Sequence, residues 1–151
     1  MVIKYFGGDI PVSGPLTASD EAIRATEQRV TVAANAAIDT FAINDALAVI
    51  WELVDELNGY ITEQEPWALA KNEADRERLG TVLATAVHGL GTLAVLLNPV
   101  LPKATAKLWT ALGGTEPLDD QSIATAWEFA GGTAVSALES SLFPRIETTD
   151  T

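Results

Sequence analysis

Residues 44–63 read NDALAVIWELVDELNGYITE, and this stretch decides the fold. Its apolar side chains recur every three or four positions, which places them on one face of an α-helix. That face comprises Ala46, Ile50, Leu53, Val54, Leu57 and Ile61. The acidic residues Glu52, Asp55 and Glu56 fall outside it. The pattern predicts an amphipathic helix over 44–63 that packs its apolar face against other helices.

Upstream of this stretch, the sequence predicts a second amphipathic helix over residues 18–38. Thr17 and Asp20 have the spacing of a capping-box variant, in which two side chains satisfy free backbone N–H groups at the start of a helix. The predicted apolar face comprises Ile23, Val30, Ala34, Ala37 and Phe41. Residues 1–15 contain a short apolar stretch, two adjacent glycines and two prolines. They indicate a helix tail followed by an irregular connector.

Downstream, Pro66 favours a short helical turn, because proline is well tolerated at the first position of a helix. Asn72 with Asp75 then opens a helix that continues to Asn98 and ends before Pro99. Its predicted apolar stripe comprises Leu79, Leu83, Val87, Leu90, Ala94 and Leu97.

The remaining sequence predicts a helix that follows Pro102 and ends at Gly113, and a short helix over 122–129. Helices joined by short links, without alternating strand-like segments, predict an all-α fold that is an antiparallel helix bundle. We expect one domain over residues 1–151. Within it we expect a connector at 1–16, a helical core at 17–114, and a short helix and tail at 115–151.

Composition excludes several classes of site. The chain has 151 residues and a formal net charge of −12, which repels phosphate backbones and disfavours generic nucleic-acid binding. It has no cysteine and one histidine, His88, so the usual thiolate metal sites and histidine-based triads are excluded. No uninterrupted apolar run approaches the roughly 18–20 residues of a membrane span. We expect a soluble cytoplasmic protein with no membrane partner, no metal and no cofactor of its own.

The remaining chemical side chains favour structural roles. His88 lies one position from a predicted apolar stripe, so we expect it to pack or to lie at the solvent edge. The carboxylate runs are interpreted as solvated helix faces and caps. Trp51, Trp109 and Trp127 lie within helical patterns and are expected to pack.

Trp67 differs from the other tryptophans because it lies beside Pro66 at a break between predicted helices. Bundles often bury an aromatic side chain at a helix end, so a packing role is one interpretation. The other is a stacking platform, because an unpaired RNA base laid on tryptophan contributes about 1–3 kcal/mol. Position alone leaves both interpretations open.

The segment NGYITEQEPWALAK, residues 58–71, resembles the N-x-Y-(I/V)-x-x-x-x-P-W-x-x-A-K stretch of the anticodon-binding domains of bacterial methionyl-tRNA synthetases. Three further segments are similar to that family in the same order: YFGG at 5–8, LNPVLP at 97–102 and LFPRIE at 142–147. The resemblance therefore covers nearly the whole chain. Class I synthetases for isoleucine, valine, leucine and cysteine share the bundle, but the combination of motifs favours methionine.

The resemblance implies that Trp67 contacts the CAU anticodon of methionine tRNA, stacking on an unpaired base. Pro66 would fix the approach of the indole through its restricted φ. Asn58, Tyr60 and Lys71 match the motif as well and are candidate anticodon-binding residues. Each also has a plain structural interpretation, as a helix-break hydrogen bonder, a packing residue and a partner of a helix C-terminus respectively.

The resemblance also implies a longer parent, a methionine–tRNA ligase that uses ATP and Mg²⁺ in a separate catalytic domain. The family's nucleotide-binding H-I-G-H and K-M-S-K-S signatures do not occur here; HGLG at 88–91 ends in the wrong residue. No catalytic residue is predicted, and the chain is expected to be inactive alone. An alternative function is an acidic helical scaffold or protein-interaction domain without catalysis.

Two base-reading residues of the family, an asparagine and an arginine one helical turn apart, belong to a first bundle helix that would precede Met1. We therefore expect that helix to be truncated here. Its loss would leave an apolar face that pairs with the remainder of the synthetase or with a partner chain.

Overall fold

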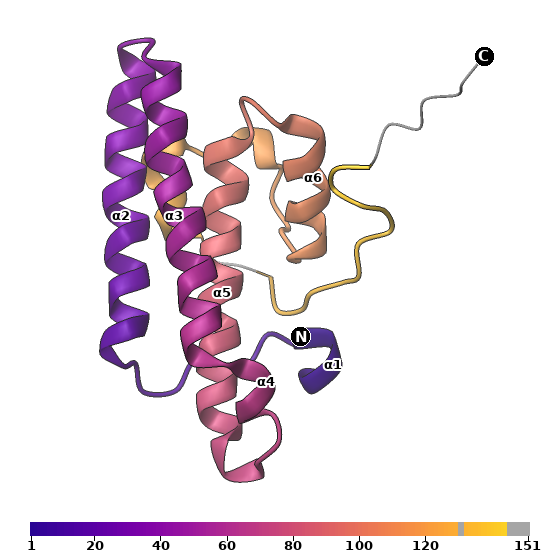
Figure 1. The fold of residues 1–151 in the computed structure, drawn as a ribbon. Coiled ribbons are helices and arrows are strands. Elements are labelled where there is room, and N and C mark those ends of the chain that lie inside the picture. The colour runs from indigo at the N-terminus through magenta and orange to yellow at the C-terminus, as the bar shows by residue number, and fades with distance from the viewer. Residues whose placement is uncertain (130–131, 145–151) are drawn as a thin grey trace, which may run out of the picture.

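The computed structural model describes residues 1–129 and 132–144, and within them the chain is helical (Figure 1). The α-helices are α1 (Val2–Phe6), α2 (Ala18–Asp39), α3 (Ile43–Gln64), α4 (Pro66–Leu69), α5 (Arg76–Leu97) and α6 (Pro102–Ala111). The short 3₁₀ helices are η1 (Glu73–Asp75), η2 (Leu118–Asp120) and η3 (Ile123–Glu128). Figure 1 shows α2, α3 and α5 side by side, with α6 next to one end of α5. The predicted antiparallel helix bundle is confirmed.

Helices α2 and α3 form a hairpin whose bounds lie within one residue of the predicted ranges 18–38 and 44–63. The predicted capping box is present, with Thr17 and Asp20 each bonding the backbone of the other. Phe41 was expected on the apolar face of the first of these helices, and this was wrong. The helix ends at Asp39, and Phe41 lies in the turn with a φ of 59° and 89% of its surface exposed.

Helix α5 is the core helix, because α2, α3, α4, α6 and η3 all pack on it. Gly89 and Gly91 let two of these neighbours approach closely. A Cβ at Gly89 would lie 2.7 Å from Leu57, and one at Gly91 would lie 2.1 Å from Phe129. Any larger residue would push α3 or the end of η3 away.

The helical stretch Glu73–Leu97 contains an 18-residue window that is apolar enough to cross a membrane, with a mean hydropathy of 1.7. However, 78% of that apolar window is buried inside the bundle, which is the usual position of a core helix. Leu90 departs from the predicted stripe and is 38% exposed.

The predicted helix at 122–129 is the 3₁₀ helix η3, which is irregular at Thr125 (φ −121°, ψ 20°) and packs on α2 and α5. The segment after it returns to the N-terminal connector. Ile10 donates a backbone hydrogen bond to the carbonyl of Thr133 at 2.9 Å, and Val135 donates one to Gly8 at 2.8 Å. The three-part division of the chain at residues 16 and 114 stays a prediction.

Two clusters of buried apolar side chains hold the bundle together. The larger joins α2, α3, α5, α6 and η3 around side chains such as Val30, Leu53 and Val82. The smaller joins α1 to α5 through Val2, Leu79 and Leu83. Leu69 of α4 packs against both clusters, so this single turn is fastened to the core.

Candidate functional site

Trp67 lies where α3 gives way to α4, and its surface is 42% exposed. Between the helices, Glu65 adopts the left-handed conformation with a φ of 43°, which turns the chain sharply. Pro66 follows as the first residue of α4 and is buried. The turn is closed by backbone hydrogen bonds from Ala68 to the carbonyl of Glu65 (2.7 Å) and from Ala70 to that of Pro66 (3.0 Å). The indole is therefore carried to the surface on an anchored turn.

The other predicted site residues divide by exposure. Asn58 on α3 and Lys71 after α4 are exposed, and the side chains of both are accessible to a ligand. Tyr60 is 4% exposed and its hydroxyl donates a hydrogen bond to Asp20. A direct RNA contact by Tyr60, one of the roles implied by the resemblance, is not supported by this structure, because helix α3 turns that ring into the bundle. The packing interpretation fits the observed position.

The carboxylate of Asp20 is fully buried. It is the centre of a polar network that reaches Gln64, one residue before this turn. Thr17 donates its backbone N–H and its hydroxyl to Oδ2 at 2.7 and 2.9 Å. Arg78 donates to both carboxylate oxygens, at 2.5 and 3.0 Å, and the Tyr60 hydroxyl donates to Oδ1. Arg78 also donates to Oε1 of Gln64, the last residue of α3. The network joins the start of α2, the end of α3 and the start of α5.

These contacts shift the acidities of the three titratable members. Burial alone would raise the pKa of Asp20, but the hydrogen bonds from Arg78, Tyr60 and Thr17 outweigh it and hold that pKa well below its ordinary value. Burial and the hydrogen bond to the Asp20 carboxylate raise the pKa of the Tyr60 phenol. Burial lowers and the Asp20 carboxylate raises the pKa of Arg78, and the net direction is upward. The charged pair is therefore maintained at neutral pH.

The sequence indicated only part of this network. The capping-box spacing identified Asp20, but the partners Arg78 and Gln64 were missed. They lie 58 and 44 positions from Asp20 in the chain, and pairing at that separation depends on how three helices pack. The available signal was an arginine in the first turn of one helix and a glutamine in the last turn of another, and such residues are also common on solvated surfaces.

His88 pairs with Glu27, whose side chain is 2% exposed; the Nδ1 atom lies 2.9 and 3.0 Å from the two carboxylate oxygens. The Phe129 ring lies edge-on to the imidazole, with the ring centroids 6.1 Å apart. His88 thus has a structural partner on α2, in agreement with the packing role expected for it.

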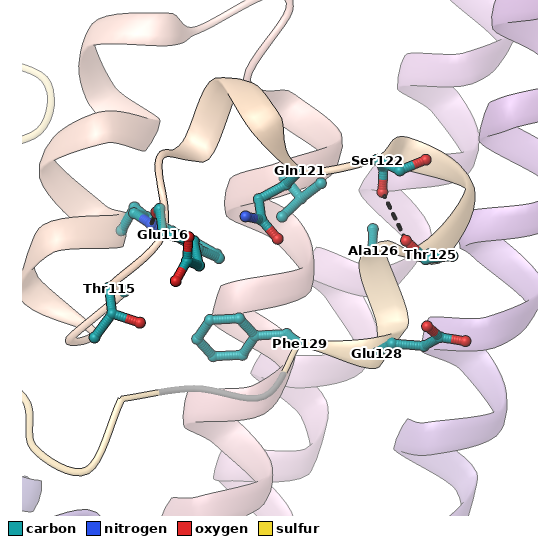
Figure 2. A pocket seen from close by; sticks show the side chains of 11 residues that line it. Thr115, Glu116, Gln121, Ser122, Thr125, Ala126, Glu128 and Phe129 are labelled. Atoms are coloured by element: carbon teal, nitrogen blue, oxygen red, sulfur yellow. Dashed lines mark hydrogen bonds between the residues drawn. The ribbon is translucent and has the colours of Figure 1, made fainter.

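A pocket of about 220 Å³ lies beside η3. In Figure 2 the ring of Phe129 and the amide of Gln121 point into the space between the Thr115–Glu116 loop and η3. Trp109 and Val95 also line it. The lining carries hydroxyl, amide and carboxylate groups but brings no nucleophile and base together.

Among residues 1–129 and 132–144, no three acidic or histidine side chains are grouped so that they could hold a metal ion. Of the remaining tryptophans, Trp109 is buried and Trp127 is half-buried, but the expectation that Trp51 packs was wrong. Trp51 lies on the solvent face of α3 and is 51% exposed. A helical bundle with an anchored, exposed indole at a helix junction defines an all-α domain that offers a binding surface.

Comparison with known proteins gives the family. Residues 10–151 match the family described as the anticodon binding domain of methionyl tRNA ligase. The chain therefore belongs to the anticodon-binding domains of the methionyl-tRNA ligases.

The individual relatives agree. The methionine–tRNA ligase of Streptomyces coelicolor is 37% identical over 158 residues, covering 97% of this chain and 29% of that protein. Methionine–tRNA ligase 1 of Bacillus cereus is 35% identical over 150 residues, covering 97% of this chain and 23% of that protein. The chain thus spans less than a third of the length of these relatives.

The fold agrees as well. The apo crystal structure of methionyl-tRNA synthetase from Mycobacterium tuberculosis superposes with a TM-score of 0.85 and 30% identity, covering 97% of this chain and 30% of that one. A second structure, of the same enzyme bound by methionyl-adenylate, gives a TM-score of 0.83. The motif at 142–147 contributed to the resemblance, but Arg145, Ile146 and Glu147 lie outside the residues that the structure describes.

Proposed function

We propose that this chain reads the CAU anticodon of methionine tRNA, and that Trp67 stacks on an unpaired base of that anticodon. The observation that carries the proposal is the exposure of Trp67 on a turn whose proline is buried and whose backbone is hydrogen-bonded. A turn held in this way loses little backbone freedom when a base stacks on its indole, so more of the stacking free energy contributes to affinity.

Charge favours recognition of bases over recognition of the phosphate backbone. The chain carries a formal net charge of −12, and Glu63 and Glu65 are exposed beside the turn. These carboxylates repel a phosphate backbone. Lys71, exposed and four residues after Trp67, supplies a local positive charge, and the amide of Asn58 supplies hydrogen-bonding groups. The proposed ligand is therefore a loop with unstacked bases.

Pro66 and Tyr60 act in this proposal as supports. Pro66 is buried under the turn and sets the direction in which the chain leaves Glu65. Tyr60 fastens the last turn of α3 to α2 through its bond to Asp20.

For the whole protein we propose a methionine–tRNA ligase, which attaches methionine to its tRNA with consumption of ATP in the cytoplasm. ATP and Mg²⁺ would bind in a catalytic domain, and this chain would have no activity alone. The support is that each of the relatives above is a ligase or synthetase for methionine, more than three times as long as the part matched here.

The test is to replace Trp67 in the intact ligase. Trp67→Ala should reduce charging of methionine tRNA by about 5- to 150-fold, because stacking contributes about 1–3 kcal/mol. Methionine activation, measured by ATP–pyrophosphate exchange without tRNA, should be unchanged. Trp51→Ala is the matched control, an exposed tryptophan on the regular part of α3, and it should leave both reactions unaffected. Equal losses in charging and activation after Trp67→Ala would contradict the stacking role.

A further inference from the structure

We propose that Arg78 and Gln64 are positioning residues that hold Trp67 in its base-stacking orientation, with Asp20 as their buried anchor. The inference rests on the proposed role of Trp67. It adds the buried Asp20 and the half-buried Arg78 and Gln64, and it assigns them to recognition as well as to stability.

Residues 65–75, here called the Trp67 segment, connect α3 to α5 and carry α4 and η1. Gln64 directly precedes the segment, and Arg78 lies in the first turn of α5, three residues after its end. The hydrogen bond from Arg78 to the Gln64 side chain therefore joins the two ends of the segment across its base. Loss of this bond would let the ends move apart and would change the angle at which α4 presents the indole.

The Asp20 carboxylate anchors Arg78, and through it the bond to Gln64. A bond between two exposed side chains would constrain the segment weakly. Arg78, however, is held by both oxygens of the Asp20 carboxylate, which has no exposed surface. A bidentate arginine–carboxylate pair fixes the plane of the guanidinium as well as its position. The acceptor on Gln64 is thus bound to a group that is itself fixed to α2.

The rest of the segment is short and already ordered. Asn72 caps η1 by accepting a hydrogen bond from the backbone N–H of Ala74 at 3.2 Å, and its amide reaches Asp75 at 3.1 Å. Leu69 packs on the core. With the interior of the segment fixed and Leu69 packed on the core, a small displacement at its base would be transmitted to Trp67 as a change in the tilt of α4.

The chain offers a matched control in the pair Arg29–Glu52. It also joins two helices through a guanidinium, at 2.8 Å, but both side chains are half exposed and neither borders the Trp67 segment. Gln64→Met and Glu52→Met each remove an acceptor from an arginine with similar side-chain length. A general effect of losing such an acceptor should be the same in both variants.

The experiment is a double-mutant cycle on binding of an RNA stem-loop with CAU in its loop to the intact ligase. Gln64→Met should weaken binding by about three- to tenfold, the value of one hydrogen bond, and lower the Tm by about 2–4 °C. Arg78→Lys should do the same, because an ammonium group cannot hold both Asp20 oxygens and Gln64 together. Glu52→Met should bind at least as tightly as the unmodified protein, because it also removes a carboxylate that repels RNA. The double variant Gln64→Met/Trp67→Ala should bind no more weakly than Trp67→Ala alone.

Additive losses in the double variant, or unchanged binding by Gln64→Met, would overturn the inference. If Trp67→Ala binds normally, the stacking proposal fails, and fluorine NMR of the fluorotryptophan-labelled protein without RNA then tests positioning by itself. Gln64→Met should shift or broaden the Trp67 resonance and leave that of Trp109 in place. An unchanged Trp67 resonance would overturn the positioning role whatever the RNA result.

Discussion

Trp67 and Trp109 are the same side chain in opposite surroundings. Trp109, in α6, is 7% exposed, donates its indole N–H to the Glu116 carbonyl at 2.8 Å and packs against Phe129 at 5.0 Å between ring centroids. Trp67, at the α3–α4 junction, is 42% exposed on a turn whose proline is buried. The difference shows that the neighbouring side chains, and not the residue type, decide whether a tryptophan near a helix end is enclosed, as Trp109 is, or accessible, as Trp67 is.

The largest expected effect is on the packed member of this pair. Trp109→Ala should lower the free energy of unfolding by about 3–5 kcal/mol, because it removes a buried aromatic side chain and leaves a cavity. Denaturant unfolding followed by circular dichroism measures this loss. RNA affinity, measured where the variant is still folded, should be unchanged. A change of less than 1 kcal/mol would show that α6 relies on other contacts.

The next effect concerns the anchor beneath the exposed member. Asp20→Asn should lower the free energy of unfolding by about 3 kcal/mol, because it breaks a buried ion pair. The depressed pKa of Asp20 also predicts a pH dependence. Its stabilisation is fully present above the ordinary carboxyl pKa of 3.8 and is lost as the pH falls through the lower folded-state pKa.

Acid titration of stability separates this contribution from the rest. The unmodified protein should lose stability below about pH 4 more steeply than Asp20→Asn, which lacks the titrating group. Parallel acid slopes in the two proteins would contradict the assigned direction of the shift.

At Trp67 we expect a smaller effect, on RNA binding and not on stability. Trp67→Ala should weaken binding of the CAU stem-loop by about 1–3 kcal/mol, and should change the free energy of unfolding by less than about 1 kcal/mol because the ring is already partly solvated. Fluorescence anisotropy of a labelled stem-loop measures the first value and denaturant unfolding the second. A large loss of stability without a loss of affinity would show that Trp67, like Trp109, serves packing and does not bind RNA.

The smallest expected effect is at Trp51, and it tests whether an exposed tryptophan without a helix break beside it binds RNA. Trp51 is more exposed than Trp67, but it lies in the middle of α3 with no break beside it. Trp51→Ala should change stability by less than about 0.5 kcal/mol and leave stem-loop affinity unaltered. A loss of affinity equal to that of Trp67→Ala would show that the binding surface extends along α3.

Periodicity and end signals predicted the bundle well where a helix is long and buried on one face. The helix predicted over 44–63 is observed as Ile43–Gln64, and Thr17 with Asp20 forms the predicted cap. The expectations for Phe41 and Trp51 failed for different reasons: α2 ends at Asp39, before Phe41, and Trp51 lies outside the apolar face of α3. The turn at residues 40–42 and the exposure of Trp51 among the residues that the structure describes depend on how the helices pack.

The candidate site shows the same limit. A proline and a tryptophan at a helix break predicted the position of the turn, but the burial of Tyr60 and the Arg78–Gln64 bond depend on three helices meeting at one point. The sequence motif 58–71 matches the family as one continuous string. The structure separates it into exposed residues, which include Asn58, Trp67 and Lys71, and buried supports, Tyr60 and Pro66.

The central claim is that the Trp67 indole receives an unpaired base, and a fluorine NMR titration of the fluorotryptophan-labelled protein with the CAU stem-loop tests it most directly. The Trp67 resonance, assigned through Trp67→Phe, should move in proportion to bound RNA, while those of Trp51 and Trp109 stay in place. If the stem-loop binds and the Trp67 resonance does not move, the claim is contradicted.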